Sequence, residues 1–130
     1  MMQKVGFLGC GKIGSALVAE AEALENVQVV FVQDLVWENA QADYKIIREP
    51  DEALYADCDL VIESATAAVL NENIEMILKH CDLMMFSVTA FSDPGFQKKT
   101  EELCRTYGRK IYIPHGAILG LDGIFDGNRL

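Results

Sequence analysis

The strongest constraint on this chain is a glycine-rich stretch that directly follows an apolar run near its beginning. The run covers Val5 to Leu8, and Gly9, Gly11 and Gly14 come after it, at the start of a helical pattern. Such a short apolar run is typical of a buried parallel strand. The spacing G-x-G-x-x-G between a strand and a helix is typical of the turn that binds the pyrophosphate of a dinucleotide. We therefore predict a strand, a tight turn and a helix whose N-terminus faces a phosphate.

Each glycine of this turn has its own predicted task. Gly9 permits the tight change of direction, Gly11 leaves room for the pyrophosphate beside the backbone, and Gly14 lets the helix pack close to the strand. The helix is predicted from Lys12 to about Leu24. The apolar residues that we expect on its buried face are Ile13, Ala16, Leu17, Ala21 and Leu24.

An acidic residue follows the second predicted strand at the distance that this motif requires. The strand covers Val27 to Val32, and Asp34 lies twenty residues after Gly14 (34 − 14 = 20). A carboxylate there accepts hydrogen bonds from the adenine-side ribose and repels the additional phosphate of NADP. The alternative is a solvated turn residue. The motif thus predicts a dinucleotide site with NAD as the cofactor and NADP as the second choice.

The rest of the chain alternates between strand and helix patterns. Further strands are predicted at 43–47, 59–65, 82–87 and 110–113, with helices from Pro50, from Ala67 to Lys79 and from Pro94 to Tyr107, while 35–42 is ambiguous between loop and short helix. Alternating strands and crossover helices give a mostly parallel sheet that is covered on both faces. We predict an α/β chain with a doubly wound, mostly parallel six-stranded sheet, an NAD(P)-binding Rossmann fold, as a single domain over residues 1–130.

Ligands of such sheets bind beyond the carboxyl ends of the strands, which makes the residues after each strand site candidates. Besides the glycine turn, these are Ser64, Ala65, Thr66, Ser87, Val88, Thr89, Ala90 and the segment from Pro114 to Ala117 with His115. The alternative role for the hydroxyl residues is helix capping, by Ser64 or Thr66 for one helix and by Asp93 for the next.

Charge and hydropathy exclude several classes of partner. The formal net charge of −9 argues against a nucleic-acid or acidic-membrane surface. The N-terminal residues contain no signal-peptide pattern and no apolar run reaches membrane-spanning length, so we expect a cytoplasmic protein without membrane contact.

The four cysteines lie far apart without a C-x-x-C pair, so neither a metal site nor a disulfide framework is predicted. Cys10 lies inside the glycine turn at the start of a helix, where a thiol can have a lowered pKa and become reactive. The alternative is a small residue that the turn tolerates.

Three segments carry a resemblance to a known family. Residues 113–124 (I-P-H-G-A-I-L-G-L-D-G-I) resemble the P-S-G-A-I-x-G-L-D segment of the L-aspartate dehydrogenase family, which is related to the NAD-binding domain of homoserine dehydrogenase. Residues 59–65 (D-L-V-I-E-S-A) resemble its D-L-V-x-E-A-A/S strand, and residues 85–93 (M-F-S-V-T-A-F-S-D) its M-x-S-V-G-A-L-x-D segment. The likeness covers nearly the whole chain.

The resemblance implies oxidation of L-aspartate to iminoaspartate with hydride transfer to NAD or NADP. It places Asp34 at the ribose. His115 replaces a serine of the family, at a position where an imidazole can approach the substrate or the nicotinamide and act as a proton acceptor. The alternative is a polar loop residue beside the Gly116 turn. Thr89 replaces a family glycine. The residues implied at the pyrophosphate are Gly9, Gly11, Lys12, Ile13 and Gly14, and those implied towards the nicotinamide half are Ala65, Ser87, Thr89 and Ala90. Cys10, Ser64 and Thr66 are further candidates for contact with the cofactor.

Family enzymes continue into a second domain with the catalytic histidine and the substrate contacts, and we expect this C-terminal catalytic domain to be absent here. The chain is therefore interpreted as the cofactor-binding part of an aspartate-dehydrogenase-like oxidoreductase, which acts on a small amino acid only if a second domain is supplied. The alternative is a non-catalytic NAD(H)-binding or redox-sensing module. The C-terminal segment with Leu121, Ile124 and Phe125 is expected to be exposed or to contact a partner, which makes it the candidate surface for a homo-oligomer.

Overall fold

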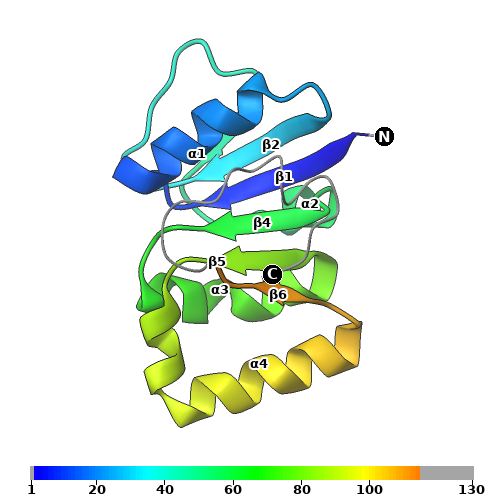
Figure 1. Ribbon diagram of the computed structural model, residues 1–130. Helices are drawn as coiled ribbons and strands as arrows, with labels where there is room; N and C mark the ends of the chain where they lie inside the picture. The colour runs from blue at the N-terminus through cyan, green and yellow to red at the C-terminus, as the bar shows by residue number, and fades with distance from the viewer. Residues whose placement is uncertain (1, 115–130) are drawn as a thin grey trace.

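The computed structural model of the chain describes residues 2–114. They form a parallel sheet of six strands with the order β3-β2-β1-β4-β5-β6 (Figure 1). The elements are β1 (Gln3–Leu8), α1 (Lys12–Ala23), β2 (Val27–Gln33), β3 (Lys45–Ile47), α2 (Glu52–Ala56), β4 (Leu60–Glu63), α3 (Ala67–His80), β5 (Asp82–Met85), the 3-10 helix η1 (Val88–Ser92), α4 (Pro94–Tyr107) and β6 (Ile111–Tyr112). The predicted doubly wound α/β fold is confirmed. The strand order reverses direction beside β1.

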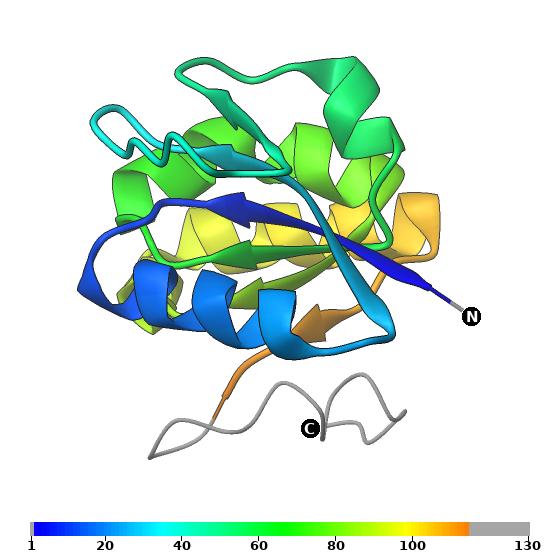
Figure 2. The same ribbon diagram turned by 90° about the horizontal axis from the view of Figure 1, so that it is seen from above.

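The helices cover both faces of this sheet (Figure 2). One hydrophobic cluster joins the sheet to α1, whereas the other joins it to α2, α3 and α4. The central strands contain consecutive buried residues, Val5 to Leu8 in β1 and all of β4, because both of their faces are covered. The helices thus pack against the two faces of the sheet and leave the carboxyl ends of its strands to loops.

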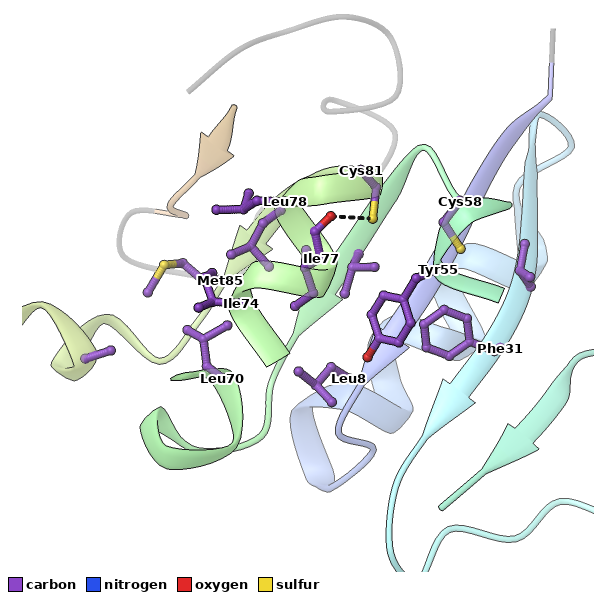
Figure 3. Close-up of a cluster of buried hydrophobic side chains, with 14 of the residues drawn as sticks. Leu8, Phe31, Tyr55, Cys58, Leu70, Ile74, Ile77, Leu78, Cys81 and Met85 are labelled. Carbon is purple, nitrogen blue, oxygen red and sulfur yellow. Dashed lines mark hydrogen bonds between the residues drawn. The ribbon is translucent and has the colours of Figure 1, made fainter. Parts of the chain in front are cut away.

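The larger cluster fixes β1 and β2 beside α2 (Figure 3). The rings of Phe31 and Tyr55 lie 4.8 Å apart between their centroids, and Leu8 packs in the same cluster. A side chain at Gly6 would collide with the Phe31 ring, so this glycine makes room for an aromatic residue across the strand pair. Full burial of a side chain of this size stabilises a fold by about 1.5–3 kcal/mol.

Side-chain caps begin three helices, as the capping alternative predicted for two of them. Asp51 accepts a hydrogen bond from the Ala53 N–H at α2, Thr66 from the Val69 N–H at α3 and Asp93 from the Gly95 N–H at α4. Pro50 was expected in the first turn of α2, but it lies before the Asp51 cap and outside the helix.

Three local expectations were wrong or incomplete. The buried face of α1 carries Gly14, Leu17, Val18 and Ala21, whereas Ile13 and Ala16 are exposed, because the close contact at Gly14 sets the rotation of the helix. The ambiguous segment 35–42 contains no helix, and η1 was not predicted. Among residues 2–114, no helix has both the length and the apolar character needed to cross a membrane.

Candidate functional site

A cleft of about 620 Å³ opens at the carboxyl edge of the sheet, where the strand order reverses. Its walls come from residues 8–11 at the end of β1, 33–36 at the end of β2, 48–50 after β3 and 64–66 after β4, together with Val69, Glu72 and Asn73 of α3. Ligands of open α/β sheets bind at this position. Segments that are far apart in the sequence thus meet at one site.

The glycines of the first turn meet three different environments. Gly9 has φ +91°, and a Cβ there would lie 2.8 Å from the backbone of Ala65. A Cβ at Gly14 would lie 2.7 Å from the Gly9 carbonyl oxygen, whereas a Cβ at Gly11 would have no heavy atom within 4 Å. Gly9 and Gly14 therefore serve the packing of the turn, as predicted. Gly11 lines the cleft and leaves open space in front of the backbone.

The helix that follows this turn presents an uncapped N-terminus. Gly11 occupies its N-cap position without a side-chain hydrogen bond, and no acidic residue lies in the first turn. The first N–H groups of a helix need partners from outside the helix, and they carry a partial positive charge. A phosphate group beside Gly11 fits both requirements.

Asp34 is held rigidly at the rim of the cleft. Its Oδ1 accepts the Cys10 N–H at 2.8 Å, and its Oδ2 accepts the N–H groups of Val36 at 3.0 Å and Trp37 at 2.8 Å. Partial burial raises the pKa of this carboxyl, but the three N–H donors and the guanidinium of Arg48 outweigh that effect and bring it below its usual value. The side chain is therefore a negative charge that hydrogen bonds hold in place at the rim of the cleft.

Arg48 is a cleft residue that the sequence pattern does not indicate. Its Nη1 donates to the carbonyl oxygens of Asp34 and Trp37, both at 2.7 Å. The pairing of β3 with β2 brings this residue beside Asp34. A basic residue directly after the third strand was the available signal, but the sequence does not reveal which strand lies next to which.

The loop after β4 packs against the glycine turn. The Ser64 hydroxyl donates to the Gly9 carbonyl oxygen at 3.3 Å, and Ala65 forms the wall that excludes a side chain at Gly9. Thr66 lines the cleft and also caps α3. The capping role considered for Ser64 is wrong, because its hydroxyl bonds to the turn.

The predicted site residues divide into two groups. The cleft brings together Gly9, Cys10, Gly11, Asp34, Ser64, Ala65 and Thr66. The cleft lining does not include Lys12, Ile13, Gly14, Ser87, Thr89 or Ala90. Ala90 is buried in the hydrophobic core beside α3 and α4, while Thr89 is exposed on η1. His115 and the C-terminal segment lie outside the described residues.

Cys10 has the properties of a structural residue. It is 5% exposed, and burial raises the pKa of its thiol to about 11, with a further contribution from the Asp34 carboxylate. The thiolate is the reactive form of cysteine. The hypothesis of a reactive thiol at the helix N-terminus is therefore wrong, and Cys10 serves the site through its N–H.

Fold and site together define an NAD-binding domain of the dehydrogenase type. Residues 9–114 match the family described as "Homoserine dehydrogenase, NAD binding domain". The chain belongs to this family.

Its relatives support the resemblance to L-aspartate dehydrogenases. The enzymes of that name from Archaeoglobus fulgidus and Methanocaldococcus jannaschii are 37% and 34% identical to it, over 97% and 95% of this chain. They are covered over 52% and 49% of their own length, so the chain spans about half of the curated relatives that it matches.

Solved structures show the same fold. Aspartate dehydrogenase from Thermotoga maritima has a TM-score of 0.74 at 24% identity, over 97% of this chain and 51% of that protein. The WlbA dehydrogenase from Thermus thermophilus, solved with NAD and α-ketoglutarate, has a TM-score of 0.68 at 18% identity, over 87% of this chain and 41% of that protein.

Proposed function

We propose that this chain is the cofactor-binding half of an oxidoreductase that transfers hydride from an L-amino acid such as L-aspartate to NAD. One observation carries the proposal: the open backbone at Gly11 faces the same cleft as the fixed carboxylate of Asp34. The L-aspartate dehydrogenases among its relatives support the substrate class.

The polar groups of the cleft fit an adenosine and a pyrophosphate. A carboxylate offers about four acceptor positions, and Asp34 uses one on Oδ1 and two on Oδ2 in the described part of the chain. The position left on Oδ1 can accept a ribose hydroxyl. Leu35 and Val36, which are 80% and 83% exposed, provide an apolar wall for the adenine.

The balance between NAD and NADP depends on two opposite charges. Asp34 repels a phosphate on the 2′ position of the ribose, which favours NAD. The guanidinium of Arg48 lies beside Asp34 and offsets part of this repulsion. We therefore propose NAD as the preferred cofactor and NADP as a weaker second ligand.

The bound nicotinamide supplies the hydride acceptor. The residues of this chain bind and orient the cofactor, and the residues proposed towards its reactive half are Ala65, Ser87, Thr89 and Ala90. Contacts to the amino acid, and His115 as a proton acceptor, belong to residues that the structure does not describe. A non-catalytic NAD(H)-binding or redox-sensing module is the second candidate, because the described cleft binds a cofactor without needing a substrate.

Calorimetric titration of the 130-residue chain with NAD and with NADP tests the cofactor assignment. We expect saturable binding of both, with NAD tighter. Absence of binding at millimolar concentration would overturn the assignment, and tighter NADP binding would overturn the role of Asp34. Aspartate-dependent NADH formation then separates an enzyme from a binding module, and we expect it only when the second half of the family enzyme is supplied.

A cytoplasmic location, a homo-oligomer formed through the C-terminal segment, and the absence of nucleic-acid and membrane partners stay predictions from the sequence. Size-exclusion chromatography with light scattering tests the oligomer.

A further inference from the structure

A buried carboxylate, Glu63, lies at the last position of β4, and the proposed function assigns it no role. It is 0% exposed. Its Oε1 accepts the N–H groups of Phe86 at 3.1 Å and Ser87 at 3.0 Å. Its Oε2 accepts the Ala65 N–H at 2.9 Å and the Ser87 hydroxyl at 2.5 Å. Four donors thus converge on one side chain.

These four bonds join two loops that α3 and β5 separate in the sequence. Ala65 belongs to the loop after β4, while Phe86 and Ser87 belong to the loop after β5. A carboxylate has about four acceptor positions, so Glu63 is saturated by its neighbours. A buried charge is tolerated when hydrogen bonds satisfy it completely, and such bonds fix geometry strongly.

The two loops lie at the proposed nicotinamide end of the carboxyl edge. In the strand order β3-β2-β1-β4-β5-β6, a cofactor with its adenosine over β2 and its pyrophosphate at β1 extends towards β4 and β5. Ala65 also forms the wall against Gly9. The position of Ala65, and through it the end of the glycine turn, therefore depends on the same carboxylate that positions Ser87.

We propose that Glu63 is a positioning residue that holds Ala65 and Ser87 in place for the nicotinamide half of the cofactor. This inference rests on the proposed function. Glu63 does not touch the cofactor, because all of its acceptor positions are occupied by the two loops. It acts through Ser87, whose hydroxyl hydrogen it accepts, so that the Ser87 oxygen is left as an acceptor for a donor group of the ligand.

The test compares NADH with ADP-ribose, which has the same adenosine diphosphate but no nicotinamide. In Glu63→Gln an NH₂ group replaces one carboxylate oxygen and faces a backbone N–H, either that of Ala65 or those of Phe86 and Ser87. The loop that carries this N–H must then move away. We expect NADH affinity to fall about tenfold more than ADP-ribose affinity, because an unpaired buried donor is costly. A purely structural role for Glu63 would weaken both ligands by the same factor.

Asp59→Asn is the matched control at the other end of β4. The Asp59 Oδ2 also accepts a backbone N–H, that of Lys4, at 2.9 Å, but it lies at the opposite edge of the sheet. This acid-to-amide change should leave the ratio of the two affinities unchanged. A change in the ratio as large as that in Glu63→Gln would overturn the proposal.

The other outcomes are also decisive. If the unchanged chain binds neither ligand, the proposed function fails. If it binds both and Glu63→Gln keeps the ratio, the positioning role fails while the cofactor site stands. Circular dichroism reports whether Glu63→Gln folds. If it does not, Ser87→Ala, which removes only the hydroxyl donor, decides: a fall in NADH affinity of roughly threefold relative to ADP-ribose supports the proposal, and an unchanged ratio overturns it.

Discussion

Two glycines of the same turn should respond to alanine in opposite ways. Gly9 has φ +91°, and a Cβ there would lie 2.8 Å from the Ala65 backbone. The left-handed backbone costs about 1–2 kcal/mol for a residue with a Cβ, and the overlap costs about 1–3 kcal/mol more. Gly9→Ala should therefore lower the free energy of unfolding by about 2–5 kcal/mol, or the melting temperature by roughly 10 °C or more.

Gly11→Ala should leave the fold intact and damage binding. Gly11 has φ −80°, outside the left-handed region that favours glycine, and its added methyl group would have no heavy atom within 4 Å. We expect a change in unfolding free energy within about 0.5 kcal/mol. In the complex, however, the methyl group would occupy the space proposed for the pyrophosphate, so NAD affinity should fall about tenfold or more.

Thermal unfolding followed by circular dichroism, together with calorimetric titration of NAD, measures both effects. If Gly11→Ala binds NAD as tightly as the unchanged chain, the cofactor does not pass over Gly11. If Gly9→Ala is as stable as the unchanged chain, the close contact with Ala65 does not constrain the turn.

Three further predictions concern the residues around Asp34. Asp34→Ala should weaken NAD about tenfold more than NADP by calorimetry, because it removes the repelling charge and leaves Arg48 in the cleft; an equal loss would contradict the ribose role. The pKa of Asp34 is lower in the folded chain than its usual 3.8, so its contribution to stability is present above that pH and is lost as the pH falls through the lower, folded value. Urea unfolding of the unchanged chain and of Asp34→Asn should therefore differ at pH 6 and converge towards pH 3, whereas a difference that grows on acidification would reverse the sign. Finally, with its pKa at about 11, on the order of one Cys10 side chain in a thousand is thiolate at pH 8, so iodoacetamide should label it slowly in the folded chain and rapidly in urea, as mass spectrometry can show.

The sequence predicted those parts of the site that depend on local pattern. The turn from Gly9 to Gly14 and the carboxylate of Asp34 could be found because their spacing follows from one strand, one turn and one helix. Their packing roles, at Gly9 and Gly14, agree with the observed contacts.

Residues whose position depends on strand order could not be found in this way. Arg48 reaches Asp34 only because β3 pairs with β2. Glu63 belongs to an apolar strand pattern, and apart from Ala65 its partners come from a loop more than twenty residues away, at Phe86 (86 − 63 = 23) and Ser87. On α1, Leu17 and Ala21 are buried as predicted. Ile13 is exposed, because the contact made by a glycine sets the rotation of the helix, whereas hydrophobicity favoured burial of Ile13.

Because Gly9 and Ala65 are in contact, a bound cofactor also links the loops that follow β1 and β4. β1 and β4 are neighbours in the sheet, but α1, β2, β3 and α2 separate them in the sequence. A dinucleotide that rests on the glycine turn and on the loop after β4 binds only when these two strands are paired. Its binding therefore stabilises the folded state in which β1 and β4 are paired, by about 2.7 kcal/mol at a concentration one hundred times its dissociation constant. The cofactor of this domain thus also stabilises the junction between strands β3-β2-β1 and strands β4-β5-β6.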